Sequence, residues 1–173
     1  MKKIILLFVV MFVVASADAQ FYVGGAVSTS LETKNDVESV SIKFLPEAGF
    51  NINDKFGVGA VIGFSQTRYD GKSLGSTYQF SPYARFTFYR SDLVRVFLDG
   101  GFSVYSTDLS GSDESITTFD IGVKPGIAVN VSEKISLVGK FGFIGLRHLD
   151  DDHNIVDVSL DATDISFGLL FSF

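Results

Sequence analysis

The two histidines of this 173-residue chain lie in one acidic stretch, His148-Leu149-Asp150-Asp151-Asp152-His153. Imidazoles and carboxylates can bind a metal or act as a general base, but this spacing matches no standard metal-ligand pattern. A serine hydrolase needs its nucleophile beside a histidine, and Ser159 is the nearest serine in this segment. The chain has no cysteine, so a thiolate site is excluded. We therefore expect no catalytic residue, metal or cofactor, and only weak cation binding by Asp150, Asp151 and Asp152.

Further charged residues recur at every second position of otherwise apolar segments, among glycines, serines and alanines. They are Lys43, Glu47, Arg85, Arg95, Asp99, Asp120, Lys124 and Lys140. Charges that are buried persist only when they are paired or hydrated. If these positions face one enclosed space, we predict an ion-pair network in which Asp99 lies between Arg85 and Lys124.

The elements that would position these side chains are β-strands, because apolar residues recur with a period of two after Gln20. From Val40 to Ile52 this alternation runs for more than ten residues, whereas strands of soluble proteins average about five or six residues. A tilted strand that crosses a bilayer needs about 9–11 residues. Eight such segments are predicted, with no charge on the apolar face, which includes Phe143. They span residues 21–29, 40–52, 56–64, 78–88, 94–104, 119–131, 135–143 and 165–173.

The volume of the side chains decides which face points inward. The interior of a closed eight-stranded barrel is just wide enough for side chains to fill it, so the face rich in Gly, Ser and Ala must be the inner one. The face rich in Phe, Val, Ile and Leu then lies outside, and it exceeds the apolar patch of a soluble monomer. We therefore expect it to contact lipid. The alternative is a soluble lipocalin-like carrier, with the apolar face inward around a hydrophobic ligand.

The connections between the segments alternate in length. Tight turns are expected at 53–55, 90–92 and 132–134, and longer connections at about 32–38, 70–76, 107–116 and 147–161. Outer-membrane barrels have short periplasmic turns and longer extracellular loops, so we expect both termini in the periplasm. Carboxylates far outnumber cations in the longer connections, and divalent cations would bridge them to lipopolysaccharide or to another surface.

Three prolines interrupt the predicted strands. Pro46, Pro82 and Pro125 all fall on the apolar face, and each lacks the N–H that a strand donates to its neighbour. A closed barrel has no free edge at which such a gap is harmless. We expect a bulge or a lost ladder bond at each proline.

The N-terminus has the pattern of a secretory signal peptide. Lys2 and Lys3 precede an apolar run from Ile4 to Ala15, and Ala17-Asp18-Ala19 is a small-x-small cleavage pattern. The run is shorter than the roughly 20 residues of a spanning helix. We expect residues 1–19 to be removed and residues 20–173 to form the barrel. The net charge of −6 argues against a nucleic-acid partner.

The last segment, Ile165-Ser166-Phe167-Gly168-Leu169-Leu170-Phe171-Ser172-Phe173, alternates and ends in phenylalanine. Together with the signal peptide and the eight amphipathic segments, it resembles the small OmpA/OmpX-like outer-membrane β-barrel family of Gram-negative bacteria. The resemblance implies an all-β fold, an eight-stranded antiparallel up-and-down transmembrane barrel. It also implies that the outer-membrane assembly machinery reads a signal at Phe167, Leu169, Phe171 and Phe173.

The function that we predict is non-enzymatic. A monomeric barrel with a plugged lumen would have a structural or adhesion-type surface role through acidic extracellular loops, with outer-membrane lipid and lipopolysaccharide as neighbours and an extracellular partner that no motif identifies. Two alternatives remain at this stage. One is a lipid A-modifying enzyme, and the other is a narrow ion pore gated by switching ion pairs.

Overall fold

The computed structural model describes residues 20–34, 37–69, 72–110, 115–149, 153–159 and 165–173. The predicted signal peptide and Asp150, Asp151 and Asp152 lie outside these residues. Among the described residues, no helix is long and apolar enough to cross a membrane. The strands are β1 (Gln20–Lys34), β2 (Val37–Asn51), β3 (Phe56–Tyr69), β4 (Lys72–Arg90), β5 (Val94–Leu109), β6 (Ser115–Asn130), β7 (Ile135–Lys140), β8 (Phe143–Leu149), β9 (His153–Ser159) and β10 (Ser166–Ser172).

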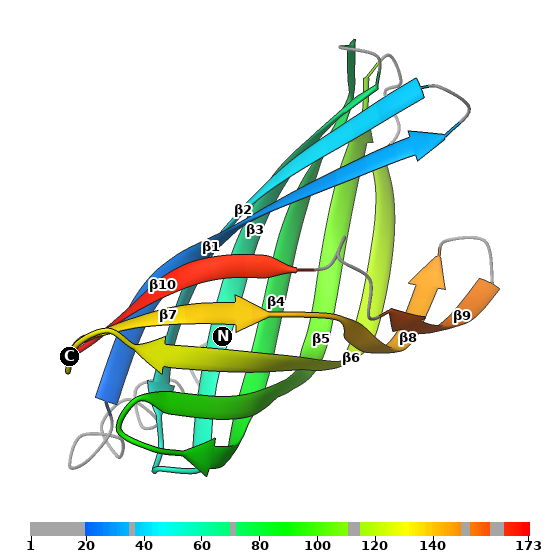
Figure 1. Ribbon diagram of the computed structural model, residues 1–173. Coiled ribbons are helices and arrows are strands. Elements are labelled where there is room, and N and C mark those ends of the chain that lie inside the picture. The colour runs from blue at the N-terminus through cyan, green and yellow to red at the C-terminus, as the bar shows by residue number, and fades with distance from the viewer. Residues whose placement is uncertain (1–19, 35–36, 70–71, 111–114, 150–152, 160–164) are drawn as a thin grey trace, which may run out of the picture.

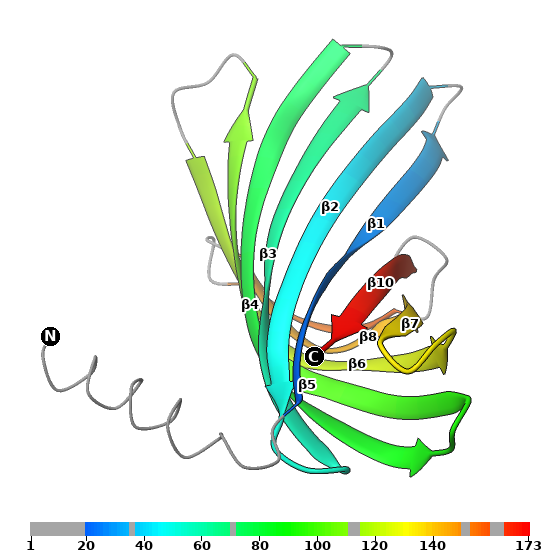
Figure 2. The same cartoon turned by 90° about the vertical axis from the view of Figure 1, so that its left-hand side faces the viewer.

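These strands form one antiparallel sheet that closes on itself (Figures 1 and 2). From β1 to β6 each strand pairs with the next, and β10 pairs with β1 to close the ring. Both β7 and β8 pair with β6, so they are two parts of one barrel strand. In the same way β10 pairs with β7 and β9 with β8, as two parts of the last barrel strand. The predicted eight-stranded up-and-down barrel is therefore confirmed.

The apolar face points outward. Ile62, Phe44 and Phe80 are 64%, 56% and 50% exposed, although they lie in the middle of their strands. On the same strands, the alternate side chains of Glu47 and Ser81 are buried in the lumen. The predicted lipid-facing belt is thus present, and the lipocalin-like arrangement, with apolar side chains inward, is wrong.

A break between β7 and β8 shifts this alternation by one residue. Gly142 has φ 71°, in the left-handed region that favours glycine, and the pairing with β6 moves by one residue across the break. Phe143 was predicted to face lipid, and that prediction is wrong, because its side chain is 5% exposed and lines the lumen. Arg147, predicted to begin a loop, is instead a residue of β8 that also lines the lumen.

Each proline lies where a ladder is interrupted on one side. The pairing of β2 with β3 skips residues 45–46, and that of β4 with β5 skips residues 81–82. At Pro125, β6 passes from its partner β7 to its partner β8. On their other sides Pro46, Pro82 and Pro125 remain in continuous register. The prediction of lost ladder bonds at these prolines is confirmed.

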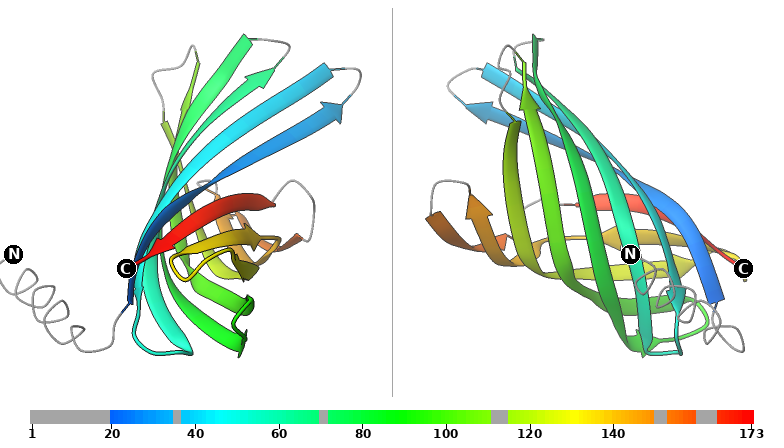
Figure 3. Two further views of the ribbon diagram at one scale, coloured as in Figure 1. Left: turned by 60° about the vertical axis from the view of Figure 1, so that its left-hand side comes forward. Right: turned by 180° about the vertical axis from the view of Figure 1, so that it is seen from behind.

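At the end of the barrel opposite the tight turns, the strands are longer than the apolar pattern predicts. The end with the tight turns, here called the turn end, also carries Gln20 and Phe173; the opposite end is the loop end. Most of the connections predicted at 32–38, 70–76 and 107–116 are strand, and β9 lies within the one predicted at 147–161. The long loops were therefore overestimated. Figure 3 shows the long strands. Backbone pairing continues beyond the apolar belt because hydrogen bonds between strands do not require apolar side chains.

Candidate functional site

The turn end of the lumen is filled by large side chains. A buried apolar cluster there consists of Tyr22, Phe97, Ala128, Val138 and Leu170. Ala128 was predicted to face inward, but the large apolar cluster members Tyr22, Phe97, Val138 and Leu170 were missed, because we predicted mainly small and polar residues inside the barrel.

Glycines on neighbouring strands make room for the inward-pointing rings. Tyr22 lies opposite Gly49, and Phe97 lies opposite Gly126. A Cβ atom at Gly126 would be 2.4 Å from the Phe97 ring, and one at Gly49 would be 2.5 Å from the Tyr22 hydroxyl. Tyr83 lies opposite Gly59 in the same way. A glycine opposite an inward aromatic residue is thus the signal in the sequence that could have located these rings.

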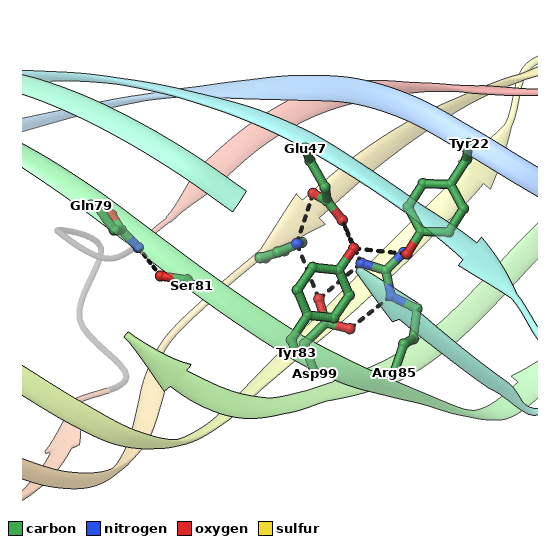
Figure 4. Close-up of polar contacts among 8 residues, drawn as sticks. Tyr22, Glu47, Gln79, Ser81, Tyr83, Arg85 and Asp99 are labelled. Carbon is green, nitrogen blue, oxygen red and sulfur yellow. Dashed lines mark hydrogen bonds and ion pairs between the residues drawn. The ribbon is translucent and has the colours of Figure 1, made fainter. Parts of the chain in front are cut away.

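Four predicted charged residues meet directly above this apolar cluster, on its loop-end side (Figure 4). Arg85 donates from Nε and Nη2 to the two carboxylate oxygens of Asp99, at 2.7 and 2.8 Å, and from Nη2 to Glu47 Oε1 at 2.9 Å. Lys140 Nζ lies 2.9 Å from Glu47 Oε2 and 3.0 Å from Asp99 Oδ2. Two cations and two anions therefore alternate in a closed ring, here called the lumen network.

Aromatic rings enclose the lumen network. The Arg85 guanidinium lies 4.0 Å from the centroid of the Phe97 ring, and Lys140 Nζ lies 4.9 Å from that of Tyr83. Both geometries are those of cation–π contacts. The Tyr83 hydroxyl donates to Glu47, so the 2.7 Å hydrogen bond between the two tyrosine hydroxyls is donated by Tyr22. Every carboxylate oxygen of the network has a donor, which is the condition for keeping such charges in a low dielectric.

The other predicted lumen charges lie outside this ring. Asp120 accepts hydrogen bonds from Arg147 Nε and Nη2 at 3.1 and 3.3 Å, a pair that the sequence analysis missed because of the shift at Gly142. Arg95 lies at the turn end and donates to Ser136. Lys124 lies opposite Asp99 in the register, with its Nζ 5.6 Å from the centroid of the Phe143 ring.

A cavity of about 390 Å³ occupies the lumen on the loop side of the network. Glu47, Tyr83, Asp99 and Lys140 form its floor, and Lys43 is among the residues of its wall. Most other wall residues are small and many carry hydroxyl groups; they include Ser28, Ser41, Ser65, Thr67, Thr77, Ser81 and Ser103. The cavity is therefore lined by many hydroxyl groups, and the lumen network closes it toward the turn end.

The comparison with protein families decides the identity of this fold. The family model of the outer membrane protein beta-barrel domain matches residues 4–173. The chain belongs to this family. It is accordingly an outer-membrane protein.

Solved structures of outer-membrane barrels are similar to this one. The crystal structure of Neisserial surface protein A matches with a TM-score of 0.50 and 18% identity, over 90% of this chain and 96% of that one. The N-terminal barrel domain of Pseudomonas aeruginosa OprF matches with a TM-score of 0.56 and 10% identity, over the same shares of the two chains. No curated protein sequence matches significantly. At these identities the likeness shows the fold alone.

The residues that the resemblance implies as an assembly signal lie on β10 and at its end. Phe167, Leu169, Phe171 and Phe173 all have exposed side chains on the outer face of this outer-membrane barrel. The outer face of this last strand is thus apolar and forms part of the lipid-facing belt. Their recognition by the assembly machinery stays an expectation from the resemblance.

Proposed function

We propose that this outer-membrane barrel is a non-enzymatic protein with a plugged lumen, which holds its loop end at the cell surface for contacts with other molecules. The observation that carries the proposal is the floor of the cavity. There Arg85 and Lys140 bind Glu47 and Asp99 above a packed apolar cluster. Eight strands leave little free bore, so a plug is favoured over an ion pore.

The placement of His148 supports a non-enzymatic role. Among the described residues that line the cavity there is no histidine, and His148 is exposed on β8 opposite Phe119. A lipid A-modifying hydrolase needs a nucleophile and a base in one sheltered place. The cavity of this barrel contains ion-paired carboxylates in place of such a nucleophile and base.

The loop end supports a surface role. Beyond the apolar belt, strands continue with polar residues such as Gln66, Arg68 and Asp108. These segments would project past the headgroups, where the acidic connections could bind divalent cations that also coordinate lipopolysaccharide phosphates. In this orientation the turn end and both termini lie in the periplasm.

Cysteine labelling tests the orientation, because the native chain has no cysteine. Ser115→Cys places a thiol at the loop end and Glu133→Cys places one in a turn, and both positions are exposed. In intact cells a membrane-impermeant maleimide should label the first variant and spare the second until the cells are permeabilised. The reverse pattern would rule out surface display of the loop end.

Two double variants, each of which lacks two carboxylates, test the contact between the loop end and lipopolysaccharide. Asp108→Asn with Glu38→Gln changes two acidic residues at the loop end, and Asp54→Asn with Glu133→Gln changes two in the turns. We expect calorimetry to show Ca²⁺-dependent binding of lipopolysaccharide that weakens only in the first double variant. Equal binding by all three proteins would refute a role for the acidic loop end.

A further inference from the structure

Among the described side chains of the lumen, cations outnumber anions. The cations that point inward are Lys43, Arg85, Arg95, Lys124, Lys140 and Arg147, and the anions are Glu47, Asp99 and Asp120. Cations thus outnumber anions six to three among these described residues, although the whole chain has a net charge of −6.

The cations of the lumen differ in whether a described carboxylate pairs with them. The lumen network is neutral, Arg147 is paired with Asp120, and Arg95 lies beyond the apolar cluster at the turn end. Lys43 lines the cavity, and no carboxylate in the described part of the chain lies within ion-pair distance of its ammonium group. Lys124 lines the same space.

Hydroxyl groups flank Lys43 on both neighbouring strands. Ser28 of β1 and Ser65 of β3 lie directly opposite it in the register, where Cβ atoms are about 4.5–5.5 Å apart. Thr67 donates to Ser41 at 3.3 Å, which leaves the Ser41 hydroxyl proton free to donate into the cavity. The Ser28 hydroxyl donates to the Ile165 carbonyl at 2.8 Å, so the hydroxyl groups of Ser41 and Ser65 remain as donors beside the ammonium group. Such a donor set is suited to a tetrahedral oxyanion.

The nearest carboxylate does not compete for this donor set. Glu47 lies two inward positions from Lys43 on β2, but Arg85, Lys140 and Tyr83 already bind its two oxygens. The cavity volume of about 390 Å³ falls within the range of small-molecule sites. It exceeds the size of a bare oxyanion, so an organic group attached to the anion would also fit.

We propose that the cavity binds a phosphate group through Lys43 and the hydroxyl groups of Ser41 and Ser65. The phosphate would belong either to a small solute that enters from the loop end or to the headgroup of a lipid. The site goes beyond the proposed surface role, which depends on the outside of the loop end.

The first test titrates inorganic phosphate into the full barrel, refolded in maltoside micelles that contain no phosphate. We expect saturable binding by calorimetry that sodium chloride at equal ionic strength does not reproduce. Lys43→Met should weaken it about tenfold, the loss of one charge-assisted contact, whereas Lys134→Met at an exposed turn should leave it unchanged. Absence of saturable binding, or equal binding by the Lys43→Met variant, would overturn the proposal.

A second measurement does not depend on any variant folding. In the wild-type protein, phosphate should shift the NMR signal of the Lys43 side-chain amine and leave that of Lys134 in place. A short-chain phosphatidic acid, added in place of phosphate, separates the two sources. Tighter binding of this lipid supports a headgroup and binding of free phosphate alone supports a solute, whereas no shift with either probe contradicts the site. The outcome of the Ser115→Cys labelling is independent of all these results.

Discussion

The guanidinium of Arg85 lies 4.0 Å from the centroid of the Phe97 ring while its Nε and Nη2 hold both oxygens of Asp99. Phe97 lies in turn opposite Gly126, whose lack of a side chain makes room for the ring. The buried ion pair thus packs against an aromatic ring, and the ring packs against a glycine. From the turn end upward the lumen is apolar, then ionic, then an open polar cavity.

Removing the central cation of the lumen network should destabilise the barrel strongly. Arg85→Met leaves Glu47 and Asp99, whose side chains are at most 6% exposed, with one cation, Lys140. Breaking a buried pair of this kind costs about 3–5 kcal/mol, which urea unfolding in lipid vesicles can measure.

The matched control removes an exposed arginine that is also ion-paired. Arg90 binds Asp54 between two turns at the turn end, and the Asp54 side chain is 88% exposed. Such pairs contribute less than about 1 kcal/mol, so Arg90→Met should lower the free energy of unfolding only slightly. Equal losses in the two variants would show that the network is not the buried ionic layer described here.

A methyl group at Gly126 should be costly. Its Cβ would lie 2.4 Å from the Phe97 ring, and overpacking of this kind costs about 1–3 kcal/mol. At Gly139 the nearest atoms would be 3.8 Å away, an ordinary contact. We expect Gly126→Ala to lower the free energy of unfolding and Gly139→Ala to leave it nearly unchanged. If both variants are equally stable, glycine does not make room for the ring.

The loss of stability caused by an arginine on the outer face should show which residues lie near the middle of the membrane. Ile62 lies in the middle of the belt, and Gln66 lies four residues nearer the loop end on the same face of β3. A cation at the bilayer midplane costs about 2–4 kcal/mol and one near the interface about 0–1 kcal/mol. Unfolding from vesicles should therefore show a much larger loss for Ile62→Arg than for Gln66→Arg. Similar losses would place the belt elsewhere.

The positive φ of Gly142, in the break between β7 and β8, predicts that a side chain at this position lowers the stability of the barrel. Gly142→Ala forces a side chain into φ 71°, which should cost about 1 kcal/mol or more. Gly100→Ala, where φ is not positive and the nearest atom would be 3.6 Å away, is the control. Thermal or urea unfolding that ranks Gly100→Ala as the less stable variant would argue against the break.

The alternation of residues with a period of two was enough to predict the strands and the outward face, because a belt of Phe and Ile has no place in a narrow tube. It failed at Phe143 and Arg147, because a break of two residues moves the side chains of β8 to the opposite face. It also missed Phe97, because a rule based on average volume does not register that Gly126 lies opposite.

The lumen charges illustrate the same limit. Their inward positions followed from the alternation, but which cation meets which anion depends on side-chain reach across the tube. Lys140 contacts Asp99 although neither β7 nor β8 is a neighbour of β5. Such contacts across the lumen cannot be obtained from the register of adjacent strands.

Single-channel recording from planar bilayers tests the plugged lumen most directly. With the lumen network and the apolar cluster in place, purified wild-type protein should leave the current at baseline. Stable, large openings from the same preparation would mean that the lumen conducts, and the account of a plugged surface protein would be wrong.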